Sequence, residues 1–91
     1  MAYKGWRHAV DIIVRNESQL AASLKRYRKK ADLTQTELGR AAQLRQATIS
    51  ELEAGKGATL ETLFTVLAVL NLELVVRPRR AVDDAALADL F

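Results

Sequence analysis

Two short helical segments separated by a three-residue stretch constrain the fold of this chain more than any other feature of its sequence. The first segment is predicted from Gln35 to Ala41 or Ala42, because Thr34 is a good N-cap and Glu37 completes a capping box. The second segment runs from Gln46 to Glu53. We expect it to end at Gly55, since glycine commonly stops a helix at its C-terminus. The short connection predicts that the two helices cross at a tight turn.

The apolar residues of these two helices can form one buried side. The predicted inward residues are Leu38, Ala42, Leu44, Ile49 and Leu52. Gly39 is expected where the helices cross, since a larger side chain there would hold them apart. The residues left outward on the second helix are Arg45, Gln46, Ala47, Thr48, Ser50 and Glu51.

This outward face is unusual for a helix that needs only solubility. Thr and Ser are mediocre helix formers, and the Ala methyl group forms no hydrogen bonds with water. Short polar groups are what the edges of DNA bases require, because Gln forms two hydrogen bonds with adenine, Ser or Thr bonds several bases, and Ala packs on the thymine methyl group. The spacing and this face together predict a helix-turn-helix motif that binds DNA.

Further elements are predicted on both sides of the motif. Ser18 is expected to cap a helix that continues to Ala31, and Thr59 is expected to cap a helix with an apolar stripe. The stripe consists of Leu60, Leu63, Phe64, Leu67 and Leu70, and it is either core or dimer interface. Leu72–Arg77 is predicted to be a strand. A single strand needs a partner, which is either the N-terminal segment or a second subunit.

The predicted elements divide the chain into three parts. Residues 1–17 form an N-terminal segment of uncertain structure, residues 18–77 form a helix-turn-helix DNA-binding and dimerisation domain, and residues 78–91 form a flexible C-terminal tail. A chain of 91 residues buries only about 60% or slightly more of its unfolded surface. A homodimer would supply the additional buried area.

The composition is typical of a cytoplasmic protein. The chain has no cysteine, so it contains neither disulfides nor thiolate metal ligands. Its N-terminus lacks the pattern of a signal peptide, and the most apolar segment, Leu63–Val76, is too short to cross a bilayer. We therefore expect a cytoplasmic location, with association with the nucleoid when DNA is bound, and no membrane partner.

The sequence offers little material for catalysis. The one histidine, His8, has no neighbouring residues at the spacing of a metal site or a catalytic triad. There is also no glycine-rich phosphate loop. We expect no enzymatic activity, no metal or cofactor, and no small-molecule substrate.

The net charge is +3, and most of the excess positive charge lies in the predicted helix that continues to Ala31. The basic residues of that helix are Lys25, Arg26, Arg28, Lys29 and Lys30. They can line an anionic surface or form a solvated helix face, and the sequence leaves both alternatives open for the four residues other than Arg28.

The motif resembles the Xre/Cro-type helix-turn-helix repressors. The segments Arg45–Ser50 and Leu70–Leu74 are particularly similar to HipB-type antitoxins, and the likeness extends from Ser18 to Arg77. The resemblance implies a mainly α, lambda-repressor-like helix-turn-helix bundle of four to five helices, with a C-terminal β-strand that pairs across a dimer. Repressors of this type often have glycine where this chain has Asp32 and Gln43.

The resemblance also implies roles for individual residues. Gln35 would grip a phosphate and support Gln46 as it contacts a base, and Arg28 would form a structural ion pair with Glu53. The other base-contacting residues would be Arg45, Ala47 and Ser50, and the other phosphate contacts Thr48, Lys56 and the helix start near Thr59. The paired dimer strand would contain Leu72, Leu74, Val75 and Val76. In the tail, the candidate contacts with a toxin are Leu87, Leu90 and Phe91, with a frayed terminus as the alternative.

The function implied by this resemblance is a homodimeric transcriptional repressor that acts as the antitoxin of a HipA-like kinase toxin. Such a protein would repress its own operon through a palindromic double-stranded operator. One alternative is a stand-alone Xre-family repressor without a toxin. Another is a protein-interaction module that keeps the fold without binding specific DNA.

Overall fold

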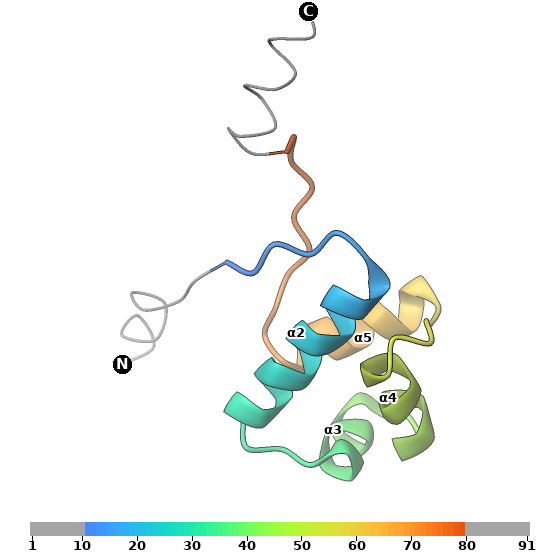
Figure 1. Ribbon diagram of the computed structural model, residues 1–91. Helices are drawn as coiled ribbons and strands as arrows, with labels where there is room; N and C mark the ends of the chain where they lie inside the picture. Colours follow the sequence, from blue (N-terminus) through green and yellow to red (C-terminus); the bar gives the residue numbers. More distant parts are fainter. Residues whose placement is uncertain (1–10, 80–91) are drawn as a thin grey trace, which may run out of the picture.

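The computed structural model describes residues 11–79, which fold into a small mainly α bundle. Its four helices are α2 (Glu17–Lys30), α3 (Gln35–Ala42), α4 (Gln46–Glu53) and α5 (Leu60–Val69). Helix α3 packs on both α4 and α5, and α2 packs on α4. The two described ends of the chain leave the bundle on the side away from α3 (Figure 1).

The N-cap of the first described helix lies two residues before the predicted one. Asn16, not Ser18, is the N-cap of α2, because the Asn16 side chain accepts a hydrogen bond from the Gln19 amide at 2.8 Å. Asn and Ser are about equally good caps, so the sequence did not distinguish between them. Ser18 instead lies in the first turn of the helix.

The two helices of the motif have the predicted bounds. Thr34 Oγ1 accepts from the Glu37 amide at 3.0 Å, and the Thr34 amide donates to Glu37 Oε1 at 2.8 Å, so the capping box is complete. Helix α3 ends at Ala42, where Gln43 follows with a φ of 59°. Asp32, after α2, has a φ of 61°. Both residues thus take the left-handed conformation that favours glycine.

Gly39 is required by the turn more than by the neighbouring helix. A Cβ atom at this position would lie 2.7 Å from the carbonyl oxygen of Leu44. The next nearest atoms, at 3.5 Å, belong to the backbone of Arg45. The predicted close approach at Gly39 is therefore present, and the atoms that a Cβ would meet are backbone atoms of the turn and of the N-cap of α4.

The core lies between all four helices. Its buried residues are Leu24, Leu38, Ile49, Leu52, Leu63, Val66 and Leu67. Only part of the predicted apolar stripe of α5 is buried, because Leu60 is 69% exposed and Phe64 is 49% exposed. Val66, which was not assigned to the stripe, is completely buried. Helix α5 therefore has a second apolar face that the other described residues do not cover.

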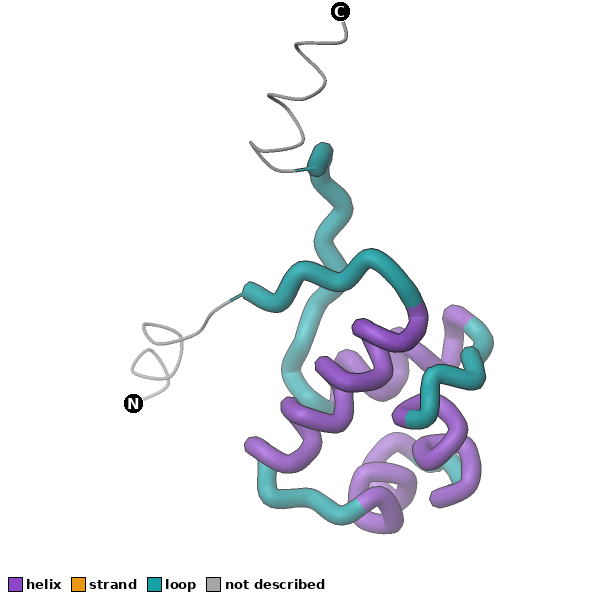
Figure 2. The backbone as a smooth tube through the Cα atoms, in the orientation of Figure 1, coloured by secondary structure: helices purple, strands orange, loops and turns teal. Residues whose placement is uncertain are grey.

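The segments outside the helices are extended or turn-like (Figure 2). Residues 11–79 contain no β-strand, so the predicted strand Leu72–Arg77 has no partner among the described residues. A strand that pairs only with a second subunit cannot form without that subunit, and it remains a prediction. The tail contacts at Leu87, Leu90 and Phe91 lie outside the described residues, as does His8.

None of the helices in residues 11–79 has the length and hydropathy needed to cross a membrane. The same residues contain no cluster of His, Asp or Glu side chains that could hold a metal ion.

Candidate nucleic-acid interface

A buried ion pair between Arg28 and Glu53 joins the end of α2 to the end of α4. Arg28 Nε donates to Glu53 Oε2 at 2.6 Å, and Arg28 Nη2 donates to Glu53 Oε1 at 3.0 Å. Arg28 Nη1 donates to the carbonyl oxygen of Leu33 at 2.7 Å. The two side chains are only 9% and 3% exposed, respectively. This two-point contact fixes the position of the Glu53 carboxylate.

Glu53 stays ionised although it is largely buried. Burial by itself would raise its pKa, but hydrogen bonds from Arg28 and Gln35 and the charges of Arg28 and Lys25 lower it. The net result is a pKa below the usual glutamate value. The hydrogen bond to Glu53 likewise raises the pKa of Arg28, despite the opposing effect of its burial. Both groups are therefore charged at neutral pH.

A hydrogen-bond relay leads from this carboxylate to the outward face of α4. Gln35 Nε2 donates to Glu53 Oε1 at 3.1 Å. Gln46 Nε2 then donates to Gln35 Oε1 at 2.6 Å. We call the three residues Gln46, Gln35 and Glu53 the glutamine relay. It joins the first residue of α3 to the first and last residues of α4.

The relay has only one polarity. An ionised carboxylate accepts hydrogen bonds and cannot donate them, so Gln35 must turn its NH2 group toward Glu53. The Gln35 oxygen is then left to accept from Gln46. Gln46 in turn keeps its Oε1 and one N–H for an external partner. The charge on Glu53 thus determines which way the exposed Gln46 amide points.

The other predicted base-contacting residues lie along α4 beside Gln46. Arg45 and Ala47 are exposed, and Ser50 is half-buried. Arg45 is the N-cap residue of α4, but its side chain makes no capping hydrogen bond. The structure therefore gathers Arg45, Gln46 and Ala47 at the exposed start of one helix, where their side chains are accessible.

The predicted phosphate contacts lie at two places in the bundle. Gln35 begins α3, and Thr48 is half-buried on α4. Lys56 and Thr59 are exposed in the loop between α4 and α5. The Thr59 hydroxyl already donates to Thr62 Oγ1 at 3.0 Å and accepts from the Thr62 amide at 3.1 Å. Only the other backbone amides at the start of α5 remain for an anion at this position.

The link between Gln35 and Glu53 was missed in the sequence, although a signal for it exists. Gln46 and Glu53 are the two ends of α4, about two helical turns apart, so both lie on one side of that helix. A residue that packs along this side can bridge them. That the residue is Gln35 depends on how α3 crosses α4.

Comparison with known proteins places these features in a family. A helix-turn-helix family model, HTH_3, matches residues 24–76. In the solved HipA-HipB-O2-O3 complex, the similar chain is 31% identical with a TM-score of 0.71, and the match covers 77% of this chain and 100% of that chain. The HipB-O4 20mer complex gives the same identity, coverage and TM-score.

A further solved structure, the clp gene regulator ClgR from C. glutamicum, is 27% identical with a TM-score of 0.59, over 67% of this chain and 80% of that chain. The comparison with curated proteins gives no significant match. The matched residues 24–76 contain all of α3, α4 and α5 and the second half of α2. The chain belongs to the Xre-type helix-turn-helix family, HTH_3, and is similar to HipB over most of its length.

Proposed function

We infer that this protein is a sequence-specific transcriptional repressor and the antitoxin of a HipA-like kinase toxin, and that it represses its own operon. The observation that carries the DNA-binding part is the glutamine relay, which holds the Gln46 amide in one orientation on the exposed face of α4. The amide is exposed, and the Oε1 and N–H that it does not use within the relay are suited to contact a base.

The free groups of Gln46 match adenine in the major groove. Its Oε1 accepts from the adenine N6 amino group, and its remaining N–H donates to adenine N7. Guanine presents two acceptors at these positions, so the Gln46 oxygen would face a guanine oxygen. Helix α4 would lie in the groove with Arg45, Ala47 and Ser50 near the neighbouring bases. Gln35, Thr48, Lys56 and the amides near Thr59 would contact phosphates.

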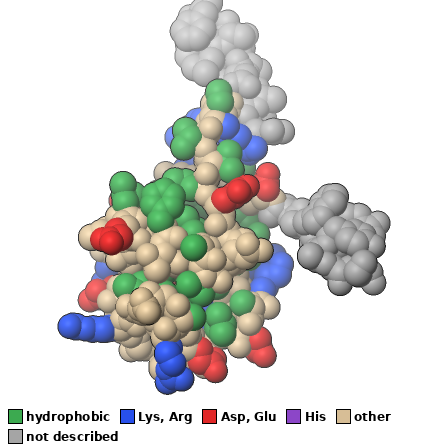
Figure 3. Space-filling view, turned by 180° about the vertical axis from the view of Figure 1, so that it is seen from behind, with side chains coloured by type: hydrophobic (Ala, Val, Ile, Leu, Met, Phe, Trp, Pro, Cys, Tyr) green, Lys and Arg blue, Asp and Glu red, His purple; other side chains and the backbone are tan. Residues whose placement is uncertain are grey.

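A second copy of this chain is the proposed occupant of the uncovered apolar face. Exposed hydrophobic side chains lie on α5 and on the extended segment that follows it, and they gather on the back of the molecule (Figure 3). They are Leu60, Phe64, Leu74, Val75 and Val76. Val76 is 91% exposed, and a group of several such side chains is typical of a surface that another protein covers.

This dimer would also give the segment Leu72–Arg77 its strand partner. Residues Leu72, Leu74, Val75 and Val76 would then form a two-stranded ribbon between the subunits. A two-fold dimer places its two α4 helices in successive major grooves about 34 Å apart, which suits a palindromic operator.

The toxin partner is proposed from the similarity to HipB. One of the similar solved chains is part of a complex that contains HipA, HipB, O2 and O3, and the similarity to it covers that whole chain. Leu87, Leu90 and Phe91 remain the candidate contacts with the toxin. A stand-alone repressor would share the DNA-binding and dimer surfaces and would lack only this partner.

The DNA-binding proposal is tested by selecting duplexes from a random-sequence library with the purified protein. We expect a two-fold symmetric site with half-sites about 10 base pairs apart, which we call the selected operator. Salt-sensitive binding without any enriched sequence would instead support the interaction module. The antitoxin proposal is tested by purifying the native complex from cells. A kinase that co-purifies in a fixed ratio supports it, and a homodimer without any kinase supports the stand-alone repressor.

A further inference from the structure

Four cationic side chains surround a shallow hollow on the outer face of α2. The hollow is lined by Ala22, Lys25, Arg26, Lys29 and Lys30, and its four charged residues are all exposed. The sequence left open whether these charges contact an anion or only keep the helix solvated. Their placement in the bundle separates them into two pairs.

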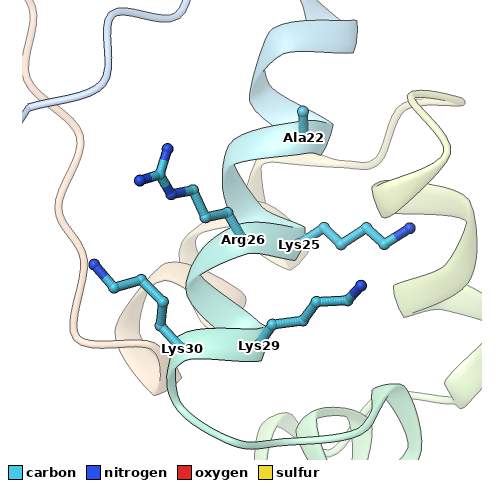
Figure 4. Close-up of a pocket in the computed structure, with 5 residues that line it drawn as sticks. All are labelled: Ala22, Lys25, Arg26, Lys29 and Lys30. Atoms are coloured by element: carbon cyan, nitrogen blue, oxygen red, sulfur yellow. The ribbon is translucent and has the colours of Figure 1, made fainter.

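The four side chains leave α2 in opposite directions. Lys25 and Lys29 extend toward the side of the bundle that holds α4, whereas Arg26 and Lys30 extend the other way (Figure 4). Each pair has the spacing of neighbours on one helix face. We call Lys25 and Lys29 the inner pair, and Arg26 and Lys30 the outer pair.

Lys25 of the inner pair lies close enough to the glutamine relay to influence its charge. The charge of Lys25 acts on the carboxylate of Glu53, which accepts the hydrogen bond from Gln35. Neither Lys25 nor Lys29 forms a salt bridge within the described part of the chain. Two ammonium groups that form no salt bridge among the described residues therefore extend toward the side of the bundle that holds α4 and the glutamine relay.

The outer pair faces other parts of this chain. The Lys30 ammonium lies 5.5 Å from the centre of the Tyr27 ring, at cation–π distance. Arg26 lines a second shallow hollow together with Ile12 and Ile13 of the segment that precedes α2. Its stem thus covers apolar surface on the side away from α4.

We propose that Lys25 and Lys29 bind phosphates of the DNA backbone next to those held by Gln35, and that Arg26 and Lys30 do not. The proposal rests on the proposed DNA-binding function and adds a sequence-independent contact to it. Lysine suits this task because its ammonium is a compact point charge on a flexible stem, which needs no fixed orientation of the phosphate. The inner pair would lengthen the protein's contact with the backbone without changing which bases are preferred.

The two pairs allow a test with a matched control. The variant Lys25→Ala/Lys29→Ala and the variant Arg26→Ala/Lys30→Ala remove the same charge from the same helix. Alanine favours helix, so both variants should fold, which circular dichroism and the urea midpoint check. The probe is a mixed-sequence duplex of roughly 30 base pairs, about three helical turns. Its affinity is measured by fluorescence anisotropy over a series of salt concentrations.

Each lost phosphate contact lowers the slope of log K against log salt concentration by about 0.9. We expect the magnitude of this slope to be smaller by about 1.8 per bound protomer in the inner-pair variant. In the outer-pair variant it should be smaller by less than half of that amount. Equal losses in the two variants, or a larger loss in the outer-pair variant, would overturn the proposal and leave the DNA-binding function standing. Failure of the unchanged protein to bind the duplex would overturn both.

The selected operator supplies a second measurement. Because the inner pair would contact only the backbone, its variant should weaken binding to the selected operator and to the mixed-sequence duplex by the same factor. A change in the ratio of these two affinities would show that the lysines affect base preference, which contradicts the proposal.

Discussion

Gln35 donates a hydrogen bond to Glu53 over 3.1 Å, and this contact couples a buried ion pair to the exposed face of α4. The carboxylate is held from the other side by Arg28. Because Glu53 can only accept, the amide groups of Gln35 and then Gln46 are oriented in sequence. An ion pair that stabilises the fold therefore also prepares the side chain that is proposed to contact a base.

Replacing Gln46 tests the base contact. Gln46→Ala should cost roughly 1–3 kcal/mol at the selected operator, with folding unchanged. Gln46→Glu should bind more weakly still, because a second carboxylate has no N–H to donate to the Gln35 oxygen or to adenine N7. Both affinities are measured by anisotropy at one salt concentration. An unaltered affinity of Gln46→Ala would refute the base-contacting role.

Breaking the ion pair should destabilise the bundle. Arg28→Met leaves the Glu53 carboxylate buried without its main partner, and we expect a loss of about 3 kcal/mol in the free energy of unfolding. The double variant Arg28→Met/Glu53→Leu should be more stable than Arg28→Met, because it buries no unpaired charge. Urea unfolding followed by circular dichroism measures both. A double variant no more stable than Arg28→Met would show that lost packing, rather than the unpaired charge, causes the loss.

The same pair predicts how stability depends on pH. The pKa of Glu53 is lowered in the folded protein, since the hydrogen bonds from Arg28 and Gln35 outweigh the opposing effect of burial. A lowered carboxyl pKa stabilises the fold above the unfolded value of about 4.3, and the contribution is lost as the pH falls through the lower folded value. The urea midpoint should therefore be flat above about pH 5 and fall below it.

Glu53→Gln is the control for this pH dependence. It should be less stable at neutral pH, and its midpoint should fall less steeply in acid. Some dependence should remain, because a hydrogen bond from the Thr34 amide also lowers the pKa of Glu37. A variant with the full acid slope of the original protein would exclude Glu53 as its source.

Gly39→Ala tests the tight turn of the motif. The added Cβ would lie 2.7 Å from the Leu44 carbonyl oxygen, and a backbone atom cannot move aside as a side chain can. We expect a net loss of about 1–2 kcal/mol, since the strain exceeds the roughly 1 kcal/mol that alanine gains over glycine in a helix. Thr36→Ala, at an exposed position of the same helix, should cost little. Equal midpoints for both variants would contradict the close contact.

Charges on the uncovered face of α5 test the proposed dimer. Leu60→Glu/Phe64→Glu should give a folded monomer by light scattering, because both side chains are exposed in the single chain and would be buried by a second copy. Ala22→Glu, on the exposed face of α2, should leave the dimer intact. If the α5 variant remains dimeric, the interface lies elsewhere.

Local signals in the sequence determined the helices of the motif. The capping box at Thr34 and Glu37 and the glycine at position 55 act within a few residues, so they predicted α3 and α4 with the bounds that the structure has. Asn16 and Ser18 can each act as the N-cap of α2, and the sequence did not show which of them does. The split of the α5 stripe also escaped prediction, because helical spacing does not tell which partner covers each side.

The orientation of Gln46 and the division of the α2 charges were decided only by the tertiary structure. Gln35 and Glu53 are distant in the sequence and meet because α3 crosses α4, so their hydrogen bond follows from packing rather than from local preference. Likewise, Lys25 and Arg26 are neighbours in the sequence but extend to opposite sides of α2. Residue types and spacing determined which chemistry this chain carries, and the packing of its helices determined which of those groups face the same partner.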